Sequence, residues 1–127
     1  MIKKKRLLWI ILIPVLALIV VGLLLYFGNF YSKYQAGKII ERTGIEGGLV
    51  VHVNCGDGQL TAGLLANDHY VVHGISKSKE SVDQARGFIQ KQGLYGEVSI
   101  DRWQGGQLPY SANLVNLLVI DQGEKVS

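Results

Sequence analysis

A long stretch without charge near the start of the chain constrains its fold more than any other feature. From Leu7 to Phe27 the sequence reads LLWIILIPVLALIVVGLLLYF, with no Asp, Glu, Lys or Arg. A helix rises about 1.5 Å per residue, so about 20 apolar residues cross the roughly 30 Å hydrocarbon layer of a bilayer. Pro14 and Gly22 are compatible with such a helix. We therefore expect one transmembrane helix over residues 7–27.

The alternative for this segment is a cleaved signal peptide. Such a peptide has a shorter apolar region, of about 7–15 residues, that ends at a small-x-small site. The sequence after Leu25 is YFGNFY, which contains no convincing site, and this favours an uncleaved anchor. The basic cluster at residues 3–6 predicts a cytoplasmic N-terminus. The rest of the chain would then be exported from an inner or plasma membrane, into the periplasm if the source is a bacterium.

Charge outside the anchor is nearly balanced. The net charge is +3, but four of the 13 Lys and Arg residues lie at residues 3–6, which leaves nine against ten acidic residues. A nucleic-acid-binding face needs clustered Lys and Arg on a folded surface, and the sequence shows no such cluster, so we predict no nucleic-acid partner. The single cysteine, Cys55, makes no internal disulfide.

The remaining sequence alternates between strand and helix patterns. The strands expected are residues 49–53, 70–75, 97–100 and 114–120; the helices are residues 33–42, 61–67 and 80–91, the last with Ser78 as N-cap. Strand–helix–strand repeats predict a parallel sheet in an α/β fold. The domains expected are a basic tail at 1–6, the transmembrane helix at 7–27, a juxtamembrane link and helix at 28–48, the α/β domain at 49–121 and a tail at 122–127.

The most informative local motif follows the first strand, where His52 to Gly58 reads HVNCGDG. Glycines there allow a tight turn and a close approach of a ligand to the backbone. A following helix start offers free N–H groups. On its own this turn is equally compatible with a plain strand-to-helix connection.

In context, residues 38–120 resemble the N-terminal half of class I S-adenosylmethionine-dependent methyltransferases. HVNCGDG is similar to the family's Asp-Leu-Gly-Cys-Gly-x-Gly turn, and GISKSKESV at residues 74–82 to its second strand and helix. LPY at 108–110 and LVNLLVI at 114–120 look like its loop and fourth strand. The resemblance implies a truncated Rossmann-like sheet of about four strands, and it implies cofactor contacts at Asn54, Gly56, Asp57, Gly58, Ser76 and Gln104.

The same resemblance argues against catalysis. Four positions at which the family carries an acidic residue are occupied here by His52, Ser76, Gln104 and Asn116. The acid replaced by Ser76 takes both ribose hydroxyls of the cofactor in the family, and a serine does not supply a bidentate, charge-assisted contact. Lys77 follows Ser76 in the sequence. Asn54 replaces the first glycine of the family's turn, and asparagine tolerates left-handed backbone angles.

The family fold has seven strands, whereas the pattern here stops after the fourth, so we expect the substrate-binding half to be missing. Residues 52–68 and 101–116 are also similar to the methyltransferase-like leader of bacterial β-propeller proteins of the pyrroloquinoline-quinone type. The sequence therefore predicts a membrane-anchored, degenerate methyltransferase-like domain that acts as a binding or interaction module. The cofactor is then none, or S-adenosylmethionine if the site is still competent. The exposed edge of a truncated sheet invites a protein partner or self-association.

Two alternatives stay open. One is a genuine methyltransferase that binds S-adenosylmethionine through Gly56, Gly58, Ser76 and Gln104 and needs a partner or a longer chain. The other is a fragment without a function of its own.

Other polar residues have plainer interpretations. The three histidines, His52, His69 and His73, are expected to be hydrogen-bonded rather than metal ligands, and Cys55 to be a small buried side chain. Asp57 and Asp121 belong near the carboxyl edge of the sheet and are expected to cap backbone groups there. Trp103 and Tyr110 are expected to cover the sheet edge. No catalytic residue and no metal site is predicted.

Overall fold

The computed structural model describes residues 2–121, so the C-terminal tail predicted at 122–127 lies outside the described residues. Its helices are α1 (Ile2–Thr43), α2 (Gln59–Gly63) and α3 (Lys79–Lys91). Its strands are β1 (Gly48–Val53), β2 (Tyr70–Ser76), β3 (Val98–Arg102) and β4 (Leu117–Ile120). Residues up to Tyr31 and residues from Ser32 onward form two separate units, which are described one at a time.

The first unit consists of the apolar part of α1. Its large apolar side chains are exposed along the whole segment, from Leu7 at 61% to Phe27 at 61%. The helix is long and apolar enough to cross a membrane, by length and composition. Helical hydrogen bonding continues through residues 29–32, where the sequence had led us to expect a short link. The segment contains no proline, and its Asn29 and Ser32 are tolerated inside a helix.

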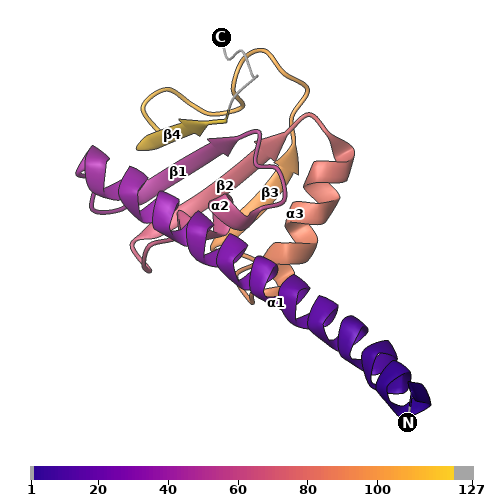
Figure 1. Ribbon diagram of the computed structural model, residues 1–127. Helices are drawn as coiled ribbons and strands as arrows, with labels where there is room; N and C mark the ends of the chain where they lie inside the picture. Colours follow the sequence, from indigo (N-terminus) through magenta and orange to yellow (C-terminus); the bar gives the residue numbers. More distant parts are fainter. Residues whose placement is uncertain (1, 122–127) are drawn as a thin grey trace. The chain divides into compact units, whose positions relative to one another are not determined.

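The second unit is an α/β domain built on a four-stranded parallel sheet in the order β3-β2-β1-β4 (Figure 1). β1 pairs with β2 through Val53↔Ile75 and with β4 through Val53↔Ile120. The carboxyl ends of these strands therefore lie at one edge of the sheet. The predicted parallel α/β fold is confirmed.

Helices α2 and α3 lie on one face of the sheet, the helical face (Figure 1). Fully buried apolar side chains from strands and helices meet there, and the last turns of α1 contribute Ala36, Ile39 and Ile40. A Cβ atom added to Gly63 in α2 would lie 2.9 Å from Ala36 Cβ and 3.3 Å from Ser32 O. The absence of a side chain at Gly63 thus allows α2 and the end of α1 to approach closely.

The opposite face, which we call the loop face, is covered by the segment between β3 and β4. Trp103, Leu108, Tyr110 and Val115 of that segment pack against Val51, Val53 and Ile75. Trp103 is 5% exposed. Trp103 and Tyr110 were expected to cover the sheet edge, whereas they pack against one of its faces.

Element ends differ from the predicted ones for local reasons. β4 begins at Leu117 and not at Leu114, because Asn116 uses its side chain to accept a hydrogen bond from Leu49 N at 2.9 Å. The chain before it turns at Asn113, where φ is 64°. α2 begins at Gln59 and ends at Gly63 rather than spanning residues 61–67, and the chain turns near Asn67, whose Oδ1 accepts the His69 N–H at 2.8 Å.

Candidate functional site

The turn after β1 has the tight geometry that its sequence predicted. Asn54, Gly56 and Gly58 have φ angles of 63°, 57° and 86°, all left-handed. Asn54 N and Cys55 N both donate to Ile75 O, at 2.8 and 3.2 Å, which ties the turn to the end of β2. Asn54 therefore adopts the backbone conformation that a glycine would otherwise supply.

The two glycines of this turn do different things. A Cβ atom on Gly56 would meet no other atom within 4 Å, so its backbone faces open space and is accessible to a ligand. A Cβ atom on Gly58 would lie 3.0 Å from Ala85 Cα, so Gly58 is needed for packing against α3. Asp57 Oδ1 accepts the Gln59 N–H at 3.0 Å, which is the backbone-capping role expected of a turn aspartate.

Ser76 ends β2 at the predicted ribose position, where it is 2% exposed. Its Oγ accepts the Ser78 N–H at 3.3 Å, and Ser78 Oγ accepts the Ser81 N–H at 3.2 Å as the N-cap of α3. The Ser76 hydroxyl therefore belongs to the local structure at the start of α3.

Lys77 crosses from the end of β2 to the segment after β3. Its Nζ lies 5.4 Å from the centre of the Trp103 ring, and its Cε lies 2.6 Å from where a Cβ of Gly105 would stand. Arg102 Nε donates to Lys77 O at 3.2 Å. Trp103 N donates to Ser76 O at 2.9 Å, which brings the neighbouring Gln104 to the same sheet edge as Ser76. All six predicted site residues thus lie at the carboxyl edge of the sheet.

Beside the turn, His52 is buried between two partners. Its Nδ1 lies 2.8 Å from Thr61 Oγ1 and its Nε2 lies 3.3 Å from Asp121 Oδ2. Burial lowers the pKa of His52 below its ordinary value, and the nearby Asp121 carboxylate opposes this shift. Burial also raises the pKa of the Cys55 thiol to about 11, which disfavours the thiolate, the nucleophilic form of cysteine.

A second chain of polar contacts links the loop face to α3. His73 Nε2 lies 2.9 Å from Asp101 Oδ2, and Tyr110 Oη lies 2.5 Å from His73 Nδ1. Arg86 extends the chain by donating to Asp101 Oδ1 at 3.1 Å. Sequence reasoning missed this network, because nothing in the local pattern places the Tyr110 loop over β2.

The contacts of His52 and His73 also show which way the two side chains point. His52 points to α2 and His73 to the loop face, so the two do not meet although they lie on neighbouring strands. Within residues 2–121 no group of three or more His, Cys, Asp and Glu side chains is arranged to hold a metal ion.

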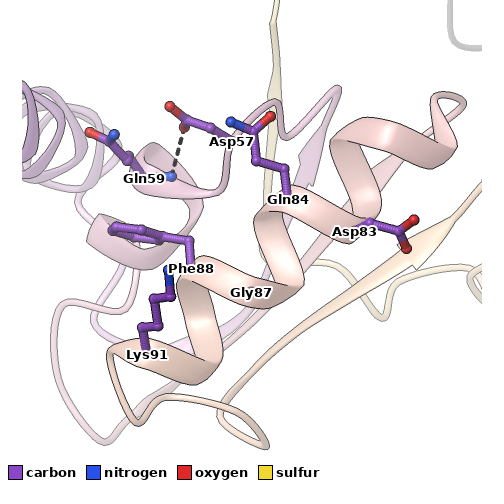
Figure 2. A pocket seen from close by; sticks show the side chains of 7 residues that line it. All are labelled: Asp57, Gln59, Asp83, Gln84, Gly87, Phe88 and Lys91. Atoms are coloured by element: carbon purple, nitrogen blue, oxygen red, sulfur yellow. Dashed lines mark hydrogen bonds between the residues drawn. The ribbon is translucent and has the colours of Figure 1, made fainter.

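A pocket of about 370 Å³ lies beside α3 (Figure 2). It is lined by Asp57, Gln59, Asp83, Gln84, Gly87, Phe88 and Lys91. Asp57 belongs to the predicted site, whereas Ser76 and Gln104 do not line this pocket. The pocket therefore shares Asp57 with the predicted cofactor contacts but does not include the predicted ribose position.

No family model and no curated protein matches this chain. Solved structures do match. A protein of Methanococcus maripaludis assigned to the S-adenosyl-L-methionine-dependent methyltransferases has a TM-score of 0.65 at 23% identity, over 71% of this chain and 41% of its own. A methyltransferase of this kind from Aquifex aeolicus has a TM-score of 0.60 at 22% identity, over 67% of this chain and 46% of its own.

The 4+2 cyclase SpnF is also similar, with a TM-score of 0.60 at 25% identity over 68% of this chain and 32% of its own. This fold thus occurs in proteins of different activity. The chain spans less than half the length of each of these structures. Over about two-thirds of its length, the chain has part of the Rossmann-like fold of class I S-adenosylmethionine-dependent methyltransferases.

Proposed function

We propose that this chain is a membrane-anchored, degenerate methyltransferase-like domain that acts as a non-catalytic binding or interaction module. The observation that carries the proposal is the state of the ribose position at the end of β2. Ser76 is buried and its hydroxyl accepts the Ser78 N–H, while Lys77 lies across the space between β2 and the Trp103 loop. A carboxylate that holds two ribose hydroxyls has no equivalent there.

The length and apolar composition of α1 support the anchored state of the domain. Residues 7–27 cross the membrane, residues 3–6 stay in the cytoplasm, and the α/β domain is exported. S-adenosylmethionine is not normally supplied on that side, which agrees with a site that has lost its ribose contacts.

The interaction partner is expected at β4 and the adjoining loop face. Leu118 and Ile120 are 39% and 45% exposed, Val71 is 51% exposed and Leu114 is 52% exposed. An edge strand with apolar side chains is a template for another chain. In a Cys55→Ala background, Leu118→Cys is expected to form intermolecular disulfides on mild oxidation in membranes, whereas Lys91→Cys on α3 is not. If the two variants cross-linked equally, or if neither cross-linked, self-association through β4 would be ruled out.

The alternative is an S-adenosylmethionine-dependent methyltransferase whose fold is completed by a partner or by further chain. The open backbone at Gly56 favours it, as does the structural likeness to a geranyl diphosphate methyltransferase solved in complex with its cofactor. In this case Gly56, Ser76 and Gln104 would contact the cofactor.

Titration calorimetry of the full chain in lipid nanodiscs decides between the two. We expect no binding of S-adenosylmethionine at micromolar concentrations, and measurable binding by the double variant Ser76→Asp, Lys77→Ile, which restores the acid and clears the lysine. Gly56→Val in the double variant is the control that removes the open turn. Micromolar binding by the parent chain, lost in Gly56→Val, would establish the alternative.

A further inference from the structure

Gly87 leaves room for a ligand in the pocket beside α3. Glycine in a helix interior is less stable than alanine, and packing does not require it here, because a Cβ atom on Gly87 would meet no other atom within 4 Å. The missing side chain instead opens the backbone of α3 to the pocket. The pocket volume of about 370 Å³ lies in the range of small-molecule sites, about 300–1,000 Å³.

Phe88 supplies an apolar wall in this pocket. Its side chain is partly buried and packs against the helical-face core, so packing fixes its position. Figure 2 shows its ring beside Gln59, with the Lys91 side chain pointing back along α3 toward it. An apolar group of a ligand placed on Phe88 would be removed from water, which favours binding.

Opposite charges flank Phe88. Asp57 comes from the turn that leads into α2, and Lys91 comes from the last turn of α3. Asp57 is held in place, because its Oδ1 accepts the Gln59 N–H at 3.0 Å. Neither Asp57 nor Lys91 forms an ion pair with another residue of the range 2–121, whereas Asp83 pairs with Lys79 at 2.9 Å. The pocket therefore offers one negative and one positive group to a ligand.

Two side-chain amides lie between these charges and the solvent. Gln84 makes no hydrogen bond with the described part of the chain, and the Gln59 amide makes only a long one, in which its Oε1 accepts from Ser32 Oγ at 3.5 Å. Each amide carries a C=O acceptor and an NH₂ donor. A peptide group presents the complementary N–H and C=O, so the lining suits a molecule that contains a peptide bond.

The spacing along α3 sets the length of that molecule. Gln84, which lies near Asp57 in Figure 2, and Lys91 are about two turns apart, or roughly 10 Å along the helix axis. An extended chain advances about 3.5 Å per residue, so a dipeptide separates its ammonium and carboxylate groups by about 7 Å. The reach of the Lys91 side chain covers the remaining distance. A single amino acid is too short to contact both charges.

From these observations we infer that the pocket beside α3 binds an apolar dipeptide with free termini. Its ammonium group pairs with Asp57, its carboxylate pairs with Lys91, and its apolar side chains lie on Phe88 and Gly87. The inference goes beyond the proposed function, because it assigns a ligand class to a pocket that does not include the ribose position at Ser76.

Titration calorimetry of the full chain in phosphatidylcholine nanodiscs tests the inference. The probes are leucyl-phenylalanine, its N-acetyl form, its C-terminal amide and free phenylalanine. We expect the unmodified dipeptide to bind, and each of the other three to bind about fivefold more weakly, which is the upper range for the loss of one exposed charge pair. Its affinity should also fall with added salt.

Matched variants assign each charge to its residue. Asp57→Asn keeps an oxygen that accepts the Gln59 N–H, and it should make the unmodified and N-acetyl dipeptides bind equally. Lys91→Met should do the same for the unmodified and amidated dipeptides. Glu80→Gln on α3 and Lys38→Met on α1 change exposed residues that do not line the pocket, and both should bind as the parent does.

Gly87→Leu separates binding from folding. Leucine has a higher helix propensity than glycine, so this variant should unfold at a higher temperature than the parent while losing the dipeptide. Undiminished binding in Gly87→Leu, equal affinity for the unmodified and blocked dipeptides, or no binding of leucyl-phenylalanine at millimolar concentrations would each overturn the inference.

S-adenosylmethionine distinguishes this inference from the proposed function. Its binding at micromolar concentrations, lost in Gly56→Val but kept in Gly87→Leu, would overturn the proposed function and leave the dipeptide pocket standing. Its binding in the pocket, lost in Gly87→Leu and competing with the dipeptide, would overturn the peptide assignment. Loss of dipeptide binding alone would leave the proposed function standing.

Discussion

At the scale of single residues, His52 makes the stability of the domain depend on pH. Burial holds the pKa of His52 below its ordinary value of 6.5, with Asp121 opposing the shift. In the unfolded chain the imidazole takes up a proton as the pH falls through about 6.5, whereas the folded domain resists it. The unfolded state then binds more protons, so the free energy of unfolding falls as the pH drops below about 6.5.

Urea unfolding followed by Trp103 fluorescence, at about pH 7.5 and about pH 5.5, measures this dependence. His52→Asn should be less stable near neutrality and should lose part of the pH dependence. His69→Gln, which changes an exposed histidine with a side chain 72% accessible, is the matched control and should behave as the parent. A parent-like pH dependence in His52→Asn would contradict the assignment.

Tyr110 provides a second prediction at this scale. The Asp101 carboxylate only accepts, so His73 Nε2 carries the proton and Nδ1 accepts from the Tyr110 hydroxyl. Burial, with a contribution from Asp101, raises the pKa of Tyr110 to about 12, so the hydroxyl remains a donor at ordinary pH. Tyr110→Phe should lower the free energy of unfolding by about 1 kcal/mol. Tyr95→Phe, at a site 56% exposed, should cost little in the same urea experiment, and equal losses would mean that the hydrogen bond is not the cause.

At the scale of elements, the contact between α1 and α2 depends on Gly63. Its added Cβ would lie 2.9 Å from Ala36 Cβ, 3.3 Å from Lys33 Cα and 3.3 Å from Ser32 O. Gly63→Ala should therefore force the helices apart and cost about 1–3 kcal/mol. Gly37→Ala is the matched control: it lies in α1 with nothing within 4 Å of the added Cβ, and it should stabilise the helix by up to about 1 kcal/mol.

Opposite signs for these two alanine substitutions in thermal unfolding would support the packing interface. If Gly63→Ala left the thermal stability unchanged, α2 would be able to move away from α1 at no cost in free energy.

The elements also show what sequence patterns convey and what they omit. The turn at Asn54, Gly56 and Gly58 was predictable because its glycines and the preceding apolar strand are local features. The contact of Lys77 with Trp103 was not, because residues 26 positions apart meet only after β2 and β3 pair. The same holds for Tyr110 and His73, which are separated by 37 positions in the sequence.

The boundary predicted between the juxtamembrane segment at 28–48 and the α/β domain at 49–121 shows a related limit of sequence patterns. Periodicity identified residues 33–42 as a helix, but it did not reveal that Ala36 is fully buried against the domain. Burial depends on the partner surface as well as on the helix itself. Sequence therefore predicted which elements form, and only the folded chain assigned them to a common core.

At the scale of the whole molecule, the membrane topology is the property on which the proposed function depends most. The proposed topology places residues 3–6 in the cytoplasm. A reporter fused after Ser127 that works only in the cytoplasm should then be inactive, and one that works only after export should be active. Replacing the Lys and Arg at residues 3–6 with Gln should weaken this orientation. Activity of the cytoplasmic reporter in the parent chain would place the domain where S-adenosylmethionine is available and would revive the enzyme alternative.

The structure also predicts which truncated forms of the chain should fold. Because Ala36, Ile39 and Ile40 belong to the helical-face core, residues 29–127 should fold without the membrane segment, whereas residues 44–127 lose apolar contacts of at least three side chains. Burying an aliphatic side chain contributes about 1.5–3 kcal/mol, and a small domain has a total stability of only about 5–15 kcal/mol. Removing this helix should therefore abolish cooperative unfolding, measured by near-ultraviolet circular dichroism. A cooperative transition in residues 44–127 would mean that the end of α1 is an appendage, and that the sheet with α2 and α3 is the complete folding unit.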